Sequence, residues 1–154
     1  MSTASISVQQ GDKIKTIQVT SGGDITDLGA TLLQYYSDQS RADALISLGD
    51  AGVVDENLNR PSSGHTFEVP AIGCCAFFGR DAGMDGTQSR EYPHYCEAFF
   101  HERQEYNYFW DNSRWFYDIG EGLTILDNNL CGISEQNSLA TLIESINYHV
   151  TELD

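Results

Sequence analysis

The chain has 154 residues and carries 23 Asp and Glu against 8 Lys and Arg, which gives a formal net charge of −15. This length is typical of one domain, here residues 1–154, and the many aromatic residues supply apolar area for a hydrophobic core. So acidic a protein is expected to repel nucleic acid and anionic membranes and to be attracted to basic protein surfaces.

No targeting or membrane-spanning segment is recognisable in the sequence. The N-terminal stretch MSTASISVQQGDK lacks the basic and apolar regions of a signal peptide, and the longest apolar run, residues 71–78, is too short to cross a bilayer. The four cysteines follow no disulfide-scaffold spacing, which favours reduced thiols. We therefore expect a cytoplasmic protein that does not enter membranes.

The predicted elements begin with a β-hairpin over residues 6–19, where apolar residues flank a Gln-Gly-Asp turn. A helix with one apolar stripe follows from about Asp24. A second short helix runs from Ser40 to Gly49, which is well placed as its C-terminal stop. These two helices are expected to pack together.

The middle of the chain alternates turn-rich and apolar segments. Residues 50–70 predict a flexible loop with one short strand candidate at residues 66–69. The apolar runs at residues 72–78 and 95–100 predict two strands. The stretch AFFGRDAGMDGTQSREY, residues 76–92, lies partly between them and is then mainly a connection between strands.

The clearest local signal is EYNYFWDNSRWFYDI, in which aromatic residues alternate on both sides of Asp-Asn-Ser. This pattern predicts a β-hairpin whose aromatic pairs form core rather than a platform for stacking bases. Residues 123–126 predict an edge strand, and a helix capped near Ser134 closes the chain. The sequence therefore predicts an α+β fold: a mainly antiparallel sheet of about five to six strands, two short N-terminal helices and a C-terminal amphipathic helix.

The glycines of the connection stand at positions 79, 83 and 86, which matches neither the dinucleotide-binding fingerprint nor a P-loop. Its acids also depart from the EF-hand pattern, because the terminal position is a tyrosine rather than a glutamate. We therefore expect a structured loop whose shape is fixed by an ion pair between Arg80 and Asp81, and we predict no bound cofactor.

Catalytic and metal sites have little support in the sequence. There is no Gly-x-Ser-x-Gly motif, and strand neighbours rarely converge into a catalytic triad, so no enzyme is predicted. His94, Cys96 and His101 are weak zinc-ligand candidates, which Cys74 or Cys75 could join. Because this spacing is not a recognised zinc pattern, buried free thiols are expected instead.

Four blocks stand in a fixed order within residues 28–119: LLQYYSDQSRADALISLGD, GHTFEVP, FFGRDAG and EYNYFWDNSRWFYDI. This order resembles a family of small proteins encoded by phages and prophages. Its members share a Leu-Gly-Asp helix, a His-x-Phe-x-x-Pro strand, a Gly-Arg-Asp loop and an aromatic hairpin. The chain departs from the family at residues 21–24, which read Ser-Gly-Gly-Asp instead of His-Trp-Asp-Gly.

The resemblance implies a mobile-element gene that acts in the cytoplasm of a bacterial host, and it supplies no activity. Small acidic phage proteins without catalytic motifs resemble counter-defence inhibitors, including anti-CRISPR proteins. With the charge, this predicts an inhibitor that binds the basic nucleic-acid-binding surface of a host defence nuclease complex and does not itself bind nucleic acid. The predicted partner-binding residues are Asp81, Asp85, Glu91, Glu135, Glu144 and Glu152.

A second hypothesis is a sponge that sequesters a defence signal nucleotide. Arg80 and Arg90 would hold its phosphates, and an aromatic ring would stack on its base. The exchange Arg80→Ala separates the two hypotheses, because it should abolish ligand binding by a sponge and matter little to an inhibitor, unless it disrupts the fold of the loop. A small zinc-binding protein stays open as a third alternative.

Overall fold

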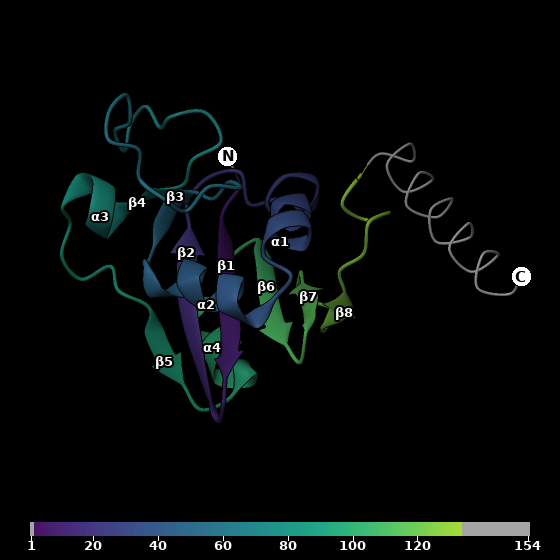
Figure 1. Cartoon of the computed structure of the whole chain (residues 1–154). Helices are drawn as coiled ribbons and strands as arrows, with labels where there is room; N and C mark the ends of the chain where they lie inside the picture. The colour runs from purple at the N-terminus through teal and green to yellow at the C-terminus, as the bar shows by residue number, and fades with distance from the viewer. Residues whose placement is uncertain (1, 134–154) are drawn as a thin grey trace, which may run out of the picture.

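The computed structural model describes residues 2–133, which form a mixed β-sheet with helices on both faces (Figure 1). The sheet has eight strands in the order β4-β3-β2-β1-β6-β7-β8, and β5 also pairs with β2. The strands are β1 (Ala4–Gln10), β2 (Lys13–Val19), β3 (Ala51–Val53), β4 (Ala76–Phe77), β5 (Arg90–Tyr92), β6 (Tyr106–Asp111), β7 (Arg114–Asp118) and β8 (Thr124–Ile125). The helical elements are a π-helical turn η1 (Ile25–Gly29), α1 (Ala30–Tyr35), α2 (Gln39–Ser47), α3 (Phe78–Ala82) and α4 (Tyr95–Glu102).

The α+β class is confirmed and most strand pairs are antiparallel, as predicted, whereas the expected five to six strands are too few. The sheet is larger, and the β1–β6 and β2–β3 pairs are parallel. Strand β1 forms a hairpin on one edge only, so its other edge receives β6 after a long crossover that brings the chain back in the same direction. Local hairpin patterns do not reveal a pairing between such distant segments.

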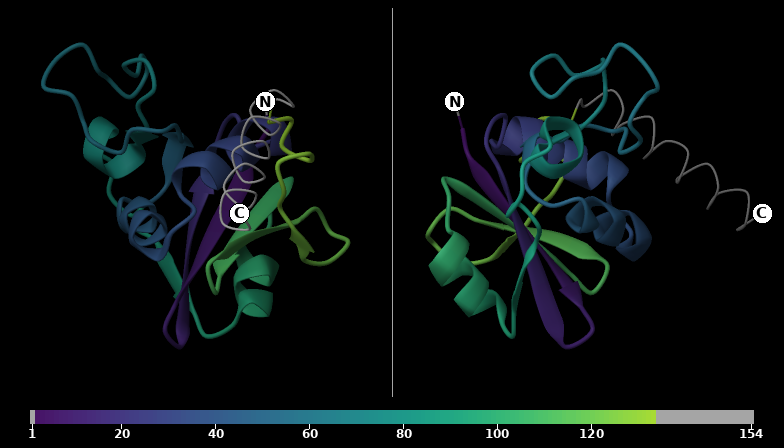
Figure 2. Two further views of the ribbon diagram at one scale, coloured as in Figure 1. Left: turned by 45° about the vertical axis from the view of Figure 1, so that its right-hand side comes forward. Right: turned by 90° about the vertical axis from the view of Figure 1, so that its left-hand side faces the viewer.

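Apolar side chains pack on both faces of the sheet because alternate strand residues point to opposite sides. On one face Ile6 of β1 and Trp110 of β6 meet helices α1 and α2 in the main core. On the other face α4 covers a smaller cluster that contains Ile14 and Phe109. Figure 2 shows α2 and α4 on opposite sides of the sheet.

Both predicted hairpins are present. In the second, Phe109 faces Phe116 and Trp110 faces Trp115, and both tryptophans are buried. The residues of its turn, at positions 112 and 113, have φ angles of 52° and 67°, as a tight two-residue hairpin turn requires. The aromatic pairs therefore lie mostly in the core, as predicted.

The two short N-terminal helices are also present, with boundaries that the sequence placed closely. Asp38 precedes α2, and its carboxylate accepts a hydrogen bond from the Arg41 amide at 2.7 Å. Gly49 follows α2 with a φ of 82°, a conformation that favours glycine. The second helix therefore ends where it was expected to end.

The strand predicted at residues 95–100 is wrong, because these residues belong to helix α4. Their apolar run also fits helical spacing, since Tyr95 and Ala98 lie three positions apart and pack against the same cluster. Short apolar runs do not distinguish a strand from a helix that packs on a sheet. Here the segment is a helix, because one side of α4 is buried against the sheet.

The predicted strand at residues 72–78 is present only as β4, and residues 66–69 form a turn instead of a strand. Gly73 has a φ of 76°, which turns the chain before it enters the sheet. Of the predicted connection between strands, residues 78–82 form α3 and residues 90–92 form β5. The connection is thus more structured than expected.

Strand β8 lies within the predicted edge strand at residues 123–126. The predicted C-terminal amphipathic helix falls in residues 134–154, outside the described residues. Within residues 2–133, none of the helices combines the length and apolar character that a membrane span requires.

Candidate partner-binding surface

The Gly-Arg-Asp segment forms helix α3, and its two charged side chains bind each other and the backbone. The carboxylate of Asp81 accepts hydrogen bonds from the Phe77 amide at 2.8 Å and from Arg80 Nη2 at 3.1 Å. Arg80 also donates to the carbonyls of Leu58 and Cys75. The ion pair expected between Arg80 and Asp81 is thus present, and it ties α3 to the chain before β4.

The His-x-Phe-x-x-Pro block packs directly against this helix. The side chain of His65 is fully buried, with Nε2 3.4 Å from Asp81 Oδ1, and its Nδ1 accepts a hydrogen bond from the Ala71 amide at 3.0 Å. Phe67 packs on Phe78 with ring centroids 4.5 Å apart. Two of the blocks quoted from the sequence therefore form one contact in space.

We call Arg60, His65, Arg80 and Asp81 the loop clamp. Arg60 completes it, with Nε 3.6 Å from Asp81 Oδ1. Burial by itself would raise the pKa of Asp81, but hydrogen bonds from Arg80 and the Phe77 amide outweigh it and hold that pKa below its ordinary value of 3.8. Because no nitrogen of His65 reaches solvent, the loop clamp is suited to holding structure rather than to acid–base chemistry.

The loop clamp holds residues 54–75, the segment between β3 and β4, which we call the clamped loop. It protrudes from the sheet above α3 in all three views (Figures 1 and 2). Its base is closed where the Asn57 amide donates to the Gly73 carbonyl at 2.9 Å and the Cys75 amide to the Asn57 carbonyl at 3.0 Å. The sequence predicted a flexible loop here, whereas the structure shows one held by buried contacts.

The predicted partner-binding carboxylates do not form one cluster. Asp81 has no exposed side-chain surface, so it does not fit a solvent-facing contact, because it is the buried centre of the loop clamp. Asp85 is exposed just after α3, and Glu91 is exposed on β5, where it pairs with Lys13 at 3.4 Å. The remaining three, Glu135, Glu144 and Glu152, lie outside the described residues.

The two arginines assigned to phosphate binding are engaged within the protein. The five N–H groups of Arg90 are directed to Asp50, Glu102 and the Gln88 carbonyl, at 2.8–2.9 Å. The carboxylates of Glu102 and Asp50 raise the pKa of Arg90. Arg80 donates to Asp81 and to two carbonyls, so neither guanidinium presents a free fork to a nucleotide phosphate.

The weak zinc-ligand candidates lie on or beside α4. His94 precedes the helix, Cys96 is exposed in its first turn, and His101 stacks on Tyr92 with ring centroids 5.7 Å apart. Among residues 2–133 no group of three or more His, Cys, Asp or Glu side chains is arranged to hold a metal ion. The helix separates side chains that a strand was expected to bring together.

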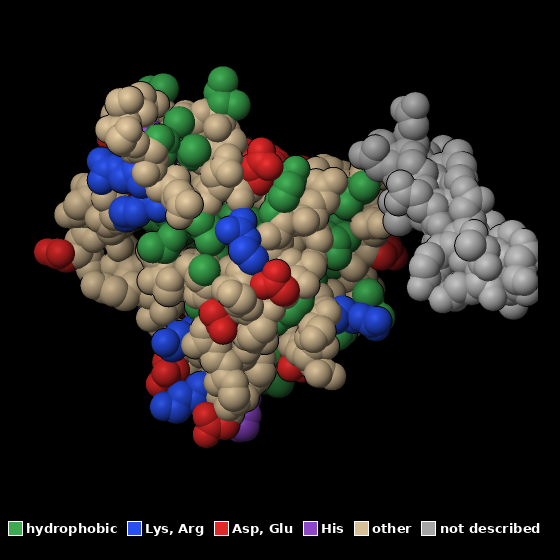
Figure 3. Space-filling view, in the orientation of Figure 1, with side chains coloured by type: hydrophobic (Ala, Val, Ile, Leu, Met, Phe, Trp, Pro, Cys, Tyr) green, Lys and Arg blue, Asp and Glu red, His purple; other side chains and the backbone are tan. Residues whose placement is uncertain are grey.

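Exposed acids outnumber exposed cations in residues 2–133. Figure 3 shows the face that carries α2, where acidic and basic side chains are interspersed and apolar side chains lie on the clamped loop. The exposed acids are Asp12, Asp27, Asp38, Glu56, Glu68, Asp85, Glu91, Glu97, Glu105, Glu121 and Asp127. The exposed Lys and Arg residues are Lys13, Arg60, Arg103 and Arg114.

The features that sequence reasoning missed are on the clamped loop. Glu56 and Glu68 are exposed there, together with Val69 and Ile72. The length of this turn-rich segment was the signal that pointed to it, because long irregular loops in compact domains are commonly functional. The apolar character of Ile72 pointed the other way, toward a buried strand.

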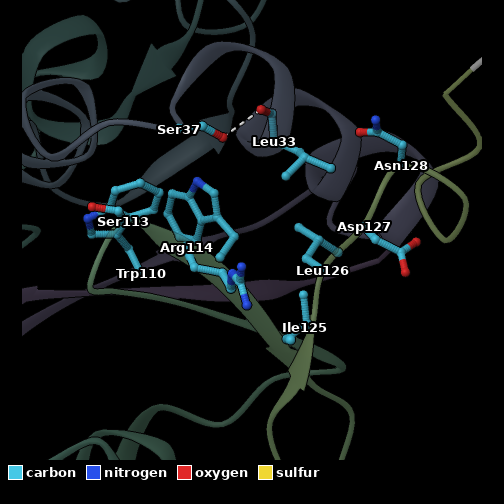
Figure 4. Close-up of a pocket in the computed structure, with 10 residues that line it drawn as sticks. Leu33, Ser37, Trp110, Ser113, Arg114, Ile125, Leu126, Asp127 and Asn128 are labelled. Atoms are coloured by element: carbon cyan, nitrogen blue, oxygen red, sulfur yellow. Dashed lines mark hydrogen bonds between the residues drawn. The ribbon is translucent and has the colours of Figure 1, made fainter. Parts of the chain in front are cut away.

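A cavity of about 500 Å³ lies between α1, the β6–β7 turn and the chain after β8 (Figure 4). The tryptophans on its wall are buried and donate their indole N–H groups inward, Trp110 to the Gln39 side chain and Trp115 to the Tyr36 carbonyl. Arg114 on its rim forms no ion pair with a residue that the structure describes. The two tryptophans of the aromatic hairpin therefore belong to the core.

Comparison with known proteins adds no assignment: no family model matches the chain, and no curated protein or solved structure matches it.

Proposed function

We propose that this protein is a phage-encoded counter-defence inhibitor that binds a basic, nucleic-acid-binding surface of a host defence complex. The excess of exposed carboxylates over exposed cations is the observation that carries this proposal. A surface of this kind attracts the Lys and Arg residues with which nucleases neutralise phosphates. The same field repels nucleic acid, so the inhibitor acts on the protein and not on its substrate.

The clamped loop and the end of α3 are the contact region that we assign to this function. They carry the exposed acids Glu56, Glu68 and Asp85. The loop clamp fixes this region before binding, because Asp81 and its partners hold the loop to α3. A surface that is already ordered loses little conformational entropy on association.

The arginines that the sponge hypothesis assigns to phosphate binding are paired within the protein, which favours the inhibitor hypothesis. Arg90 is saturated by Asp50, Glu102 and a backbone carbonyl, and Arg80 is engaged with Asp81 and the backbone. The sponge hypothesis requires these groups to release their partners before they contact a phosphate. The inhibitor hypothesis requires no such rearrangement.

The test uses the tagged full-length chain and nuclease-treated lysate of a bacterial host. We expect one protein complex to be retained at low salt, to be released as salt rises, and to be displaced by added DNA or RNA. The triple variant Glu56→Gln, Glu68→Gln, Asp85→Asn should bind that complex about tenfold more weakly, since each exposed ion pair contributes a small increment.

The matched control removes three exposed charges elsewhere, in the variant Asp12→Asn, Glu97→Gln, Glu105→Gln. It has the same net charge as the triple variant and should bind like the wild type. Equal weakening by both variants would show that only net charge matters and would exclude the assigned region. If neither salt nor added nucleic acid releases the retained complex, the protein does not occupy a nucleic-acid-binding surface.

A further inference from the structure

The clamped loop presents two aliphatic side chains, Val69 and Ile72, to solvent. Val69 retains 73% and Ile72 101% of its possible exposed surface, and both lie within the clamped loop. Isolated exposed aliphatic residues are common, but these two lie only three positions apart in the same loop. Their exposure carries an unfavourable hydration free energy that burial in a complex would relieve.

The backbone around Val69 and Ile72 is fixed by hydrogen bonds. The Val69 amide donates to Thr66 Oγ1 at 2.9 Å, and the Thr66 amide donates to the Val69 carbonyl at 3.2 Å. On the other side, the Ala71 amide donates to the buried His65 at 3.0 Å. The loop thus holds its two aliphatic side chains outward with a backbone that has already been ordered.

Ordered apolar side chains on a protruding loop have the properties of interface anchors. Binding energy concentrates in a few residues that fill pockets of the partner, while surrounding polar groups exclude water. Preorganisation increases affinity because less conformational freedom is lost on binding. Glu68 borders Val69 in sequence, so the anchor lies beside one of the carboxylates assigned above.

We propose that Val69 and Ile72 are the apolar anchor of the inhibitory interface, and that they insert into an apolar depression on the partner bordered by Lys or Arg. This inference rests on the proposed function and names the partner surface more closely. Charge complementarity supports it, because Glu56, Glu68 and Asp85 are exposed on the same loop and the adjoining helix end. The partner site is therefore a pocket within a basic surface, rather than a uniformly charged channel.

The test compares the double variant Val69→Ser, Ile72→Ser with the control Phe100→Ser. Phe100 is 81% exposed on α4, on the opposite face of the sheet from α2, so its exchange removes an equally exposed apolar group away from the loop. The affinity for the purified retained complex is measured by calorimetry at two salt concentrations. Circular dichroism and urea unfolding establish that both variants fold like the wild type.

We expect the double variant to bind at least about 10-fold more weakly, because two aliphatic side chains lose their burial, and the control to bind like the wild type. The salt dependence of binding should stay unchanged in the double variant, whereas the carboxylate triple variant should reduce it. This difference separates the apolar anchor from the charged rim of the same interface.

Three results would overturn the inference, and they differ in what they leave standing. Wild-type affinity of the double variant for a salt-sensitive complex would reject the anchor and preserve the proposed function. Absence of any complex that salt and nucleic acid displace from the wild type would reject both. If sedimentation shows that the wild type is a dimer and the double variant a monomer, Val69 and Ile72 bind a second copy of this chain instead.

Discussion

Two arginines between β4 and α4 each form ion pairs, and the two clusters stabilise different parts of the molecule. The Arg90 cluster, which consists of Arg90, Asp50 and Glu102, joins β5 to α4 and to the residue before β3. In the loop clamp, Arg80 and Asp81 join α3 to an irregular loop that carries exposed apolar residues. An arginine near an acid thus indicates an ion pair, and only the tertiary structure shows whether that pair serves the sheet or a surface.

The largest expected effect is on the Arg90 cluster. Arg90→Ala should lower the free energy of unfolding by about 3 kcal/mol, because it leaves two carboxylates without a counter-charge and Glu102 is only 6% exposed. The measurement is urea unfolding followed by tryptophan fluorescence. Arg103→Ala is the control, since Arg103 is exposed and forms an ion pair with no described acid. A similar loss of unfolding free energy in both variants would show that the Arg90 cluster does not stabilise the sheet.

A smaller effect is expected at the loop clamp. Asp81→Asn keeps the shape of the side chain but removes the charge that binds Arg80, so unfolding should become easier by about 2 kcal/mol. Hydrogen exchange should rise in residues 54–75 and stay unchanged in β6 and β7. Asp85→Asn, at an exposed position four residues later, should change neither quantity. Protection of the loop in the Asp81 variant would contradict the clamp.

The contrast between the clusters also explains what the sequence could predict. Both hairpins and helix α2 follow from patterns that are complete within a short stretch, such as the alternating aromatic residues on either side of the turn at residues 112–113. The parallel pairing of β1 with β6 and the helical state of α4 depend on segments distant in sequence. Residues 95–100 show the difference, because their apolar run satisfies two periodicities and only packing selects one.

The candidate site was predictable to a lesser degree. The pairing of Arg80 with Asp81 follows from their adjacency, whereas the contact of Asp81 with His65 depends on the path of the loop between them. The exposure of Ile72 contradicts its apolar character, and Gly73 at a positive φ turns the chain away from the core at that point. An apolar residue that is exposed in this way departs from the burial pattern on which sequence reading depends.

The smallest expected effect is in the pH dependence of the free energy of unfolding. It distinguishes the Arg90 cluster from the loop clamp by the pH range in which each loses its contribution to stability. Burial by itself would raise the pKa of Glu102, but hydrogen bonds from Arg90 and Tyr92 outweigh it and lower that pKa below its ordinary value of 4.5. The unfolded chain then binds a proton before the folded chain as pH falls. The stability that ionised Glu102 contributes is complete above its ordinary pKa and is lost as pH falls through the folded value.

Glu102→Gln should therefore flatten the fall in the free energy of unfolding below about pH 4.5, by at most about 1.4 kcal/mol per pH unit, since one titrating group is removed. Asp81→Asn should flatten the same curve in a lower window, because the ordinary pKa of Asp81 is 3.8 and its folded pKa is lower still. Urea midpoints measured between about pH 6 and pH 3 distinguish the two windows. If the two variants flatten the curve over the same pH range, the two clusters do not titrate independently. The Arg90 cluster and the loop clamp then belong to one cooperative unit.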